Sequence, residues 1–141
     1  GFTYGGHPLG CALGVKAIEI YQSRDILSCV RALAPQFQER LERLRDHPLV
    51  GEVRFKGLVG GVELVADKAT KRPFAANHGV GTICARHLEN HGVILRAIGD
   101  TIALCPPMVI TSEELSELFD SLEKALDDTE ATVTRNALRQ V

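Results

Sequence analysis

The sequence predicts an α+β fold, in which a small, mostly antiparallel sheet has helices packed on it. Apolar residues recur at helical spacing over the first 45 residues and again near the end of the chain. Short apolar runs rich in β-branched residues and interrupted by glycines lie between these helical stretches. The chain has 141 residues, 45% of them hydrophobic, which is enough for one continuous core without disulfides or a structural metal.

The first third of the chain predicts two helices. Residues 8–22 place apolar side chains at helical spacing among small residues, so we expect a helix that is buried on more than one side. Residues 25–45 alternate apolar and charged positions in the manner of a long amphipathic surface helix. Pro35 lies inside this second helix and removes a backbone donor, which predicts a kink or a split.

The middle of the chain predicts the first strands. Residues 53–65 form short apolar runs punctuated by glycines, a pattern that favours two short strands with a bulge or tight bend over a helix. Residues 67–79 are polar and contain a proline, so we expect an exposed loop. A helix over residues 80–90 should follow, with His91 and Gly92 at its C-terminal end.

The last third predicts a hairpin and a final helix. Residues 93–107 contain two β-rich runs around Gly99 and Asp100, a pair suited to a tight turn. Thr111 precedes Glu114 by three residues, the spacing of a capping box, and begins an amphipathic helix. The last dozen residues are polar and predict either a frayed end or a short extra helix.

Charge and cysteine content exclude several kinds of partner. The net charge of −2 and the scattered lysines and arginines provide no basic surface for nucleic acid and no polybasic membrane patch. No apolar run is long enough to cross a bilayer, and no secretory signal pattern is present. The four cysteines are far apart and form no C-x-x-C pair, which favours free thiols. We therefore expect a cytoplasmic protein.

Two groups of polar residues are candidates for catalysis or metal binding. A structural role is the favoured interpretation of both groups. Cys84, His87 and His91 share one helical face at metal-ligand spacing, but a buried thiol with two imidazoles near a helix end is the favoured interpretation, and no metal is expected. The acidic residues have no spacing that indicates a general acid and base, and we expect caps and surface charges at Glu63, Asp67, Asp100 and Glu114.

Thr3 and Arg96 are the candidates for ligand binding. Thr3 lies among glycines a few residues before a helix, where a hydroxyl, backbone N–H groups and the helix dipole bind phosphate, and a turn or capping threonine is the alternative. Arg96 lies in an apolar strand just before the hairpin turn. It either pairs with a surface carboxylate, which is favoured for an isolated arginine, or points into a cleft and binds an anion.

Three segments, in order, resemble the C-terminal third of class III aminotransferases, the ω-transaminase group of fold-type I pyridoxal-phosphate enzymes: GFTYGGHPLGCALGVKAIEI, VRFKGLVGGVELV and GVILRAIGDTIALCPPMVIT. The resemblance covers nearly the whole chain. It implies a loop and helix over residues 1–22 that join from the large domain, and a C-terminal small domain over residues 23–141. The large catalytic domain would lie outside this chain, in agreement with a start at Gly1 in the middle of a loop motif.

The resemblance assigns roles to particular residues. It implies that Thr3, with Phe2 close by, binds the cofactor phosphate of the neighbouring subunit, and that His7 and Pro8 set the turn into the next helix. Arg96 would grip the substrate carboxylate and swing away for an uncharged amine. The ornithine and 4-aminobutyrate branches often carry an arginine just before the Pro-Pro pair, where this chain has Ala-Leu-Cys, so the pyruvate-dependent branch is favoured. The diamino-acid branch of the biotin pathway is the alternative.

The resemblance also implies what the chain lacks. The lysine that holds the cofactor in this family, and the aspartate beside its pyridine nitrogen, belong to the large domain, and none of the five lysines here lies in a matching context. We therefore expect no catalytic residue and no activity from this chain alone. The full-length protein is expected to be a homodimeric enzyme with shared active sites, which uses pyridoxal phosphate to move an amino group between an amine or ω-amino acid and a keto acid such as pyruvate. The alternatives are a racemase, mutase or decarboxylase of the same family, and a silent stand-alone binding domain.

Overall fold

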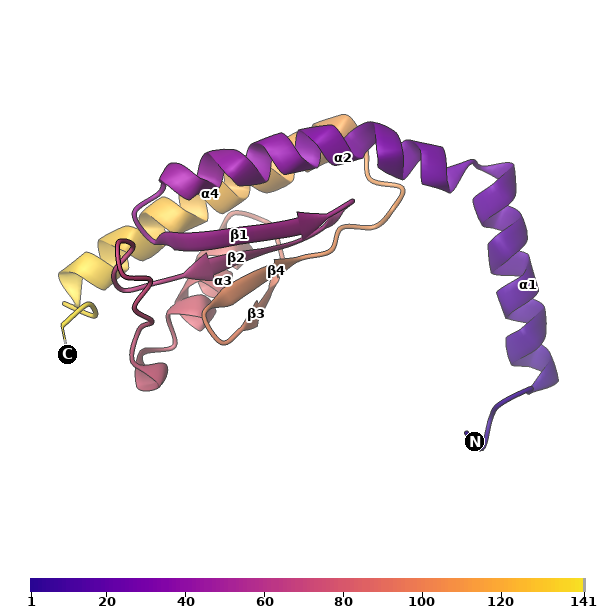
Figure 1. Ribbon diagram of the computed structural model, residues 1–141, viewed down its shortest axis with the longest axis horizontal. Coiled ribbons are helices and arrows are strands. Elements are labelled where there is room, and N and C mark those ends of the chain that lie inside the picture. The colour runs from indigo at the N-terminus through magenta and orange to yellow at the C-terminus, as the bar shows by residue number, and fades with distance from the viewer. Residues whose placement is uncertain (141) are drawn as a thin grey trace.

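The computed structural model describes residues 1–140 and confirms the predicted α+β fold (Figure 1). The helices are α1 (Pro8–Ser23), α2 (Ile26–Arg43), α3 (Val80–Asn90) and α4 (Ser112–Arg135). The strands are β1 (Val50–Lys56), β2 (Val59–Leu64), β3 (Arg96–Ile98) and β4 (Thr101–Leu104). Two short 3-10 helices, η1 (Leu44–Asp46) and η2 (Ala76–His78), lie in the connections. Within the described residues, no helix is both long and apolar enough to cross a membrane.

The four strands form one antiparallel sheet in the order β1-β2-β4-β3. Side chains alternate between the two faces of a strand. Val53, Val62 and Ile102 lie opposite one another in neighbouring strands and are fully or almost fully buried on one face. Helices α2, α3 and α4 contribute their apolar stripes to the same core, and α2 and α4 run next to each other over the strands (Figure 1). Helices therefore cover one face of the sheet and leave the other open.

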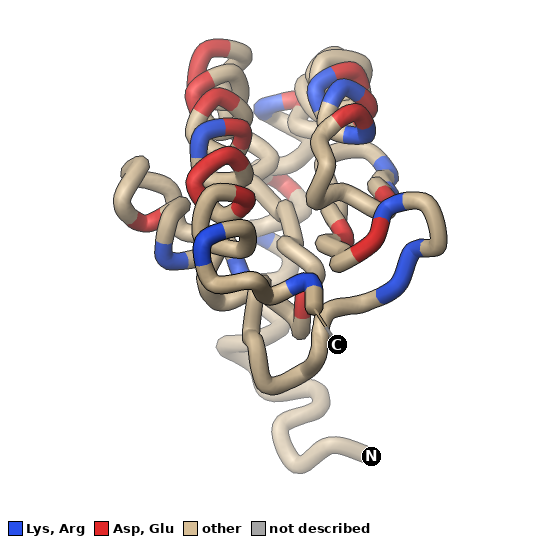
Figure 2. Tube along the Cα trace, turned by 90° about the vertical axis from the view of Figure 1, so that its left-hand side faces the viewer, with Lys and Arg blue, Asp and Glu red and all other residues tan. Residues whose placement is uncertain are grey.

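The centre of the core lies between α2 and α4. The rings of Phe37 and Phe119 meet edge to face with their centroids 5.5 Å apart, and both side chains are completely buried. The guanidinium of Arg40 lies 5.5 Å from the centroid of Phe119 and pairs with Asp120 and Glu123 at the surface. Charged residues of both signs recur along α2 and α4 (Figure 2).

The structure corrects two of the predictions for the helices. Of the kink or split predicted at Pro35, the split is wrong, because the second helix is continuous from Ile26 to Arg43. The proline ring is exposed, as is Arg31, whose carbonyl loses its helical partner, so the freed carbonyl lies on the side of the helix that faces solvent. Residues 130–140 also differ from the predicted frayed end or short extra helix: α4 continues to Arg135, and Arg139 then binds both carboxylate oxygens of Glu130 at 2.6 Å.

Helix α1 contradicts the prediction that it is buried on more than one side. None of its residues is buried, and Leu9 and Leu13 are each 63% exposed. Asp25, at φ 47°, turns the chain between α1 and α2, so that α1 projects away from the sheet and touches the domain near α2 (Figure 1). The prediction fails because its apolar residues find no second surface within the described chain. Contiguous exposed apolar side chains of this kind mark contact surfaces.

Candidate functional site

The loop before α1 places Thr3 at the surface. The Gly5 N–H donates to the carbonyl of Phe2 at 2.9 Å, and the His7 N–H donates to the carbonyl of Tyr4 at 3.1 Å, so two consecutive turns shape the loop. His7 is the residue that precedes the helix, and Pro8 is the first helical residue, where its missing N–H costs nothing. Thr3 is exposed and has no hydrogen-bond partner within residues 1–140.

The donor chemistry of this loop fits one edge of a phosphate site. A threonine hydroxyl donates a hydrogen bond to a phosphate oxygen, and the neighbouring glycines let a ligand approach the backbone. The first lysine or arginine in the sequence is Lys16, so the loop itself carries no cation to neutralise a phosphate. The loop therefore fits one contact to the phosphate of pyridoxal phosphate, the cofactor that the resemblance implies, and supplies no lysine or arginine for it.

Arg96 lies on the open face of the sheet, in a row that crosses all four strands. The register places Arg96 opposite Ala103, Ala103 opposite Gly61, and Gly61 opposite Arg54. The two residues between the arginines are small, and an arginine lies on each edge strand. Ile98 lies two residues after Arg96 on the same face of β3 and is 58% exposed. Arg96 thus projects from an apolar part of the open face.

The two arginines differ in their partners. Arg54 binds Glu63 at 2.8 Å and Glu52 at 3.3 Å, and Lys71 binds Glu52 at 3.0 Å. The hydrogen bond from Lys71, with that from Arg54, lowers the pKa of Glu52. These contacts use both carboxylates that β1 and β2 place on the open face. Arg96 has no hydrogen bond or ion pair within the described residues. An exposed guanidinium without a carboxylate partner is available to bind an anion in bidentate fashion.

Other acidic residues have structural roles, as the sequence predicts. Asp67 accepts hydrogen bonds from the N–H groups of Ala69 and Thr70, and the bond from Thr70 is the main cause of its lowered pKa. The carboxylate of Glu114 accepts from the Thr111 N–H at 2.8 Å and completes the predicted capping box. These carboxylates stabilise turns and helix ends, and none lies in an arrangement for proton transfer to a ligand.

The histidines and cysteine of α3 point to separate partners on α4. Cys84 is completely buried, which raises the pKa of its thiol to about 11. His87 lies 3.2 Å from the hydroxyl of Thr132, and His91 lies 2.8 Å from Asp128. Within residues 1–140, no group of three or more such side chains has the geometry to hold a metal ion. The side chains join α3 to α4.

The family model described as aminotransferase class-III matches residues 1–126, nearly nine-tenths of the chain. The chain belongs to this family. Putrescine–pyruvate aminotransferase of Pseudomonas aeruginosa is 43% identical over 134 residues, which cover 94% of this chain and 29% of that protein. Gamma aminobutyrate transaminase 3, chloroplastic, of Solanum lycopersicum is 41% identical over 133 residues, or 94% of this chain and 26% of the relative.

Solved structures show the same relationship. The omega-transferase from Vibrio fluvialis JS17 superposes with a TM-score of 0.89 at 42% identity, over 95% of this chain and 32% of that structure. A PMP-bound aminotransferase from Vibrio fluvialis superposes with a TM-score of 0.87 at 43% identity, over 93% of this chain and 29% of that one. This class-III aminotransferase chain therefore spans between a quarter and a third of the length of the relatives it matches.

The two candidate residues are not brought together within this class-III aminotransferase chain. Thr3 lies before α1, at the end of the projecting arm, whereas Arg96 lies in β3 on the sheet (Figure 1). Thr3 and Arg96 of the same chain therefore do not line one site. The sequence reasoning missed Gly81, which lies in the first turn of α3 against the β3–β4 turn. A glycine inside a helix costs about 1 kcal/mol relative to alanine, and this is the signal that identifies it.

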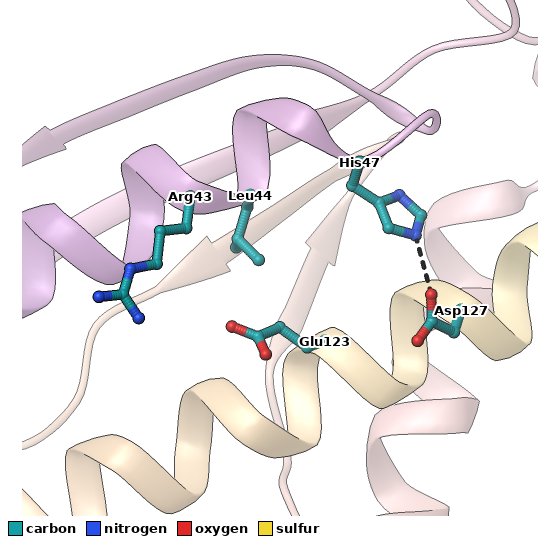
Figure 3. A pocket seen from close by; sticks show the side chains of 5 residues that line it. All are labelled: Arg43, Leu44, His47, Glu123 and Asp127. Carbon is teal, nitrogen blue, oxygen red and sulfur yellow. Dashed lines mark ion pairs between the residues drawn. The ribbon is translucent and has the colours of Figure 1, made fainter.

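A hollow of about 400 Å³ lies between η1 and α4 and contains neither candidate residue (Figure 3). Its lining residues are Arg43, Leu44, His47, Glu123 and Asp127. His47 accepts a hydrogen bond at Nδ1 from the Leu49 N–H at 3.2 Å, and its Nε2 faces Asp127 at 3.4 Å. Burial lowers the pKa of His47, and Lys68 adds to this, although Asp127 and Glu130 oppose it. The neutral imidazole is thus the form that the fold favours.

Acidification should therefore destabilise the protein through His47. The folded pKa lies below that of the unfolded chain, which is about 6.5. The stabilisation that the neutral His47 contributes to the free energy of unfolding is complete above pH ~6.5. It is lost as the pH falls from there through the folded pKa of His47. We expect the free energy of unfolding to fall between pH 7 and pH 5, and His47→Gln to reduce this slope. Urea denaturation at a series of pH values measures it, and an unchanged slope in the variant would contradict the assignment.

Proposed function

We propose that this chain is the C-terminal part of a pyridoxal-phosphate-dependent transaminase, which moves an amino group between an amine or ω-amino acid and a keto acid such as pyruvate. Membership of the class-III aminotransferases supports the reaction class. The catalytic lysine lies in the large domain that completes the enzyme. The enzyme acts on small molecules in the cytoplasm, as a homodimer with shared active sites.

The observation that carries the substrate side of this proposal is the free Arg96. It projects from an apolar part of the open sheet face, while Arg54 in the same row is already paired with Glu52 and Glu63. We assign Arg96 to the substrate carboxylate. Its long side chain permits the guanidinium to turn toward water when the bound substrate is an uncharged amine. One pocket thereby accepts both an amine and a keto acid.

We assign Thr3 to the phosphate of the cofactor. Pyridoxal phosphate, when bound, supplies the electron sink for amino transfer. When the cofactor is bound, the Thr3 hydroxyl would donate a hydrogen bond to an oxygen of its phosphate, and Phe2, the preceding residue, would lie beside it. The projecting α1 supports the assignment of Thr3 to the site of a neighbouring subunit, because the arm carries the loop away from the sheet of its own chain.

The residues before the two prolines favour a pyruvate-dependent enzyme. Leu104 is completely buried, and Cys105 lies with Pro106, Pro107 and Met108 along an apolar groove of about 490 Å³. No cation precedes the proline pair to bind a second carboxylate at that place. The relative named putrescine–pyruvate aminotransferase, at 43% identity, supports the same acceptor.

The reaction class has a direct test. The complete enzyme, incubated with pyridoxal phosphate, putrescine and pyruvate, is expected to form one alanine for each amine consumed. The 141-residue chain alone is expected to form none. Decarboxylation, racemisation or an internal shift of the amino group, as by a mutase, without alanine formation would contradict the proposal. It would favour another activity of the same family.

Loss of the Thr3 hydroxyl should weaken cofactor retention. A hydrogen bond to a charged group contributes about 1.5–3 kcal/mol, so Thr3→Ala is expected to raise the dissociation constant of pyridoxal phosphate by about tenfold or more. Thr3→Ser keeps the hydroxyl and should stay close to the parent enzyme. The ratio of cofactor to protein after exhaustive dialysis measures the effect. Equal retention in the parent and in Thr3→Ala would remove Thr3 from the phosphate site.

A further inference from the structure

The strand that carries Arg96 is short and lies at an edge of the sheet. β3 has three residues and pairs on one side with β4. Three ladder pairs on a single side hold a strand weakly, and short edge segments open easily. An arginine that binds a substrate carboxylate must nevertheless keep its backbone in place, because binding strength depends on geometry held before the ligand arrives. Something other than the ladder must therefore fix β3.

The turn after β3 is held from two sides. Asp100 accepts a hydrogen bond from the Gly81 N–H of α3 at its carboxylate Oδ1, at 2.9 Å. Its main-chain carbonyl accepts from the Leu64 N–H of β2 at 2.8 Å. Gly99, at φ 58°, supplies the positive dihedral angle that this tight turn needs. Asp100 thus joins the β3–β4 turn to the first turn of α3 and to the end of β2.

The contact between α3 and this turn requires glycine at position 81. A Cβ on Gly81 would lie 2.1 Å from the carbonyl oxygen of Gly99 and 3.0 Å from the Cα of Asp100. Both are main-chain atoms, so a side chain can be accommodated only if the turn or the helix moves. The close approach is what lets the Gly81 N–H reach the carboxylate.

The opposite end of β3 is tied to the same helix. α3 ends at Asn90, and the Gly92 N–H donates to the Glu89 carbonyl while the Val93 N–H donates to the Leu88 carbonyl, both at 3.0 Å. Three residues after Val93, the chain enters β3. Helix α3 is therefore attached near both ends of the Arg96 strand, by its own C-terminal turn at one end and by the Gly81–Asp100 contact at the other.

We propose that the contact between Gly81 and Asp100 positions Arg96 for the substrate carboxylate, so that Asp100 and Gly81 are positioning residues for keto-acid recognition. The inference rests on the proposed role of Arg96. Asp100 touches no substrate in this account. It acts by holding the hairpin on α3, and α3 in turn is joined to the rigid core through α4.

The test compares four variants of the complete enzyme: Gly81→Ala, Asp100→Ala, Asp100→Asn and, as a control, Glu117→Ala, which removes an exposed carboxylate of α4. Gly81→Ala and Asp100→Ala are expected to raise the KM for pyruvate at least about fivefold and to leave the KM for an uncharged amine within about twofold, since small displacements of a binding group cost up to ~100-fold. Asp100→Asn keeps an oxygen acceptor and should restore most of the parent KM. Glu117→Ala should match the parent.

A second readout does not depend on turnover. Hydrogen–deuterium exchange of peptides covering residues 93–105 is expected to become faster in Asp100→Ala and Gly81→Ala than in Glu117→Ala. If Gly81→Ala does not fold, Asp100→Ala alone tests whether the contact positions Arg96. This variant removes the hydrogen bond without introducing a clash. Faster exchange with an unchanged pyruvate KM, or equal KM increases for both substrates, would overturn the inference. An Arg96→Ala enzyme with no selective loss toward pyruvate would instead overturn the proposed role of Arg96.

Discussion

Replacement of Arg96 by alanine is expected to raise the KM of the complete enzyme for its keto acid by about 30-fold or more, with the KM for an uncharged amine changed by less than about threefold. Loss of a desolvated arginine–carboxylate contact costs about 2–5 kcal/mol, and each 1.4 kcal/mol is a factor of ten. The amine has no carboxylate, so its binding loses little. Steady-state kinetics with pyruvate and with a monoamine measure the two constants separately.

Arg54→Ala is the matched control for this experiment. Arg54 occupies the same cross-strand row, but it is paired with Glu63 and Glu52 on the open face. Its removal should leave the ratio of the two KM values close to that of the parent enzyme. Equal losses toward pyruvate and amine in Arg96→Ala, or a selective loss in Arg54→Ala alone, would place the carboxylate at a different part of the surface.

Among the substitutions proposed for this protein, Phe119→Ala is expected to lower the free energy of unfolding most. Phe119 is completely buried, meets Phe37 edge to face and lies beneath the guanidinium of Arg40. Truncation of a buried phenylalanine leaves a cavity and costs about 3–5 kcal/mol. This approaches the whole free energy of unfolding of many domains of this size. Urea denaturation followed by circular dichroism measures the change.

Phe119→Leu and Glu117→Ala complete that comparison. Phe119→Leu keeps most of the apolar volume and should lose far less stability than the alanine variant. Glu117 is exposed on the outer side of α4, so its replacement should change the free energy of unfolding by less than about 0.5 kcal/mol. A loss below about 1 kcal/mol in Phe119→Ala would show that the packing between α2 and α4 contributes little to the fold.

Local patterns were sufficient to predict most of the elements. The helix over residues 80–90 and the capping box at Thr111 follow from signals a few residues long, and both are present in the structure. The hairpin around Gly99 is also confirmed. Where the prediction fails, contacts between parts of the chain that are distant in sequence determine the local structure. Arg139 pairs with Glu130 and with the carbonyl of Ala66, contacts of residues 136–140 that periodicity does not reveal.

The candidate site was predicted less completely than the fold. Arg96 can be singled out as an arginine in an apolar strand, but its lack of a partner depends on Arg54 and Lys71 holding the acidic residues of the open face. The contact of Gly81 with the turn at Asp100 joins residues 19 positions apart and needs the packed structure to be recognised. The apolar content of α1 predicted burial, whereas its surface finds no partner within this chain.

A crystal structure of the complete enzyme with a bound keto acid is the most direct test of the central claim, that Arg96 receives the substrate carboxylate. The quantity to measure is the distance between the guanidinium nitrogens of Arg96 and the carboxylate oxygens of the ligand. The account predicts a bidentate contact at about 2.7–2.9 Å from each nitrogen. A carboxylate held by another cation, with Arg96 still turned toward water, would contradict it.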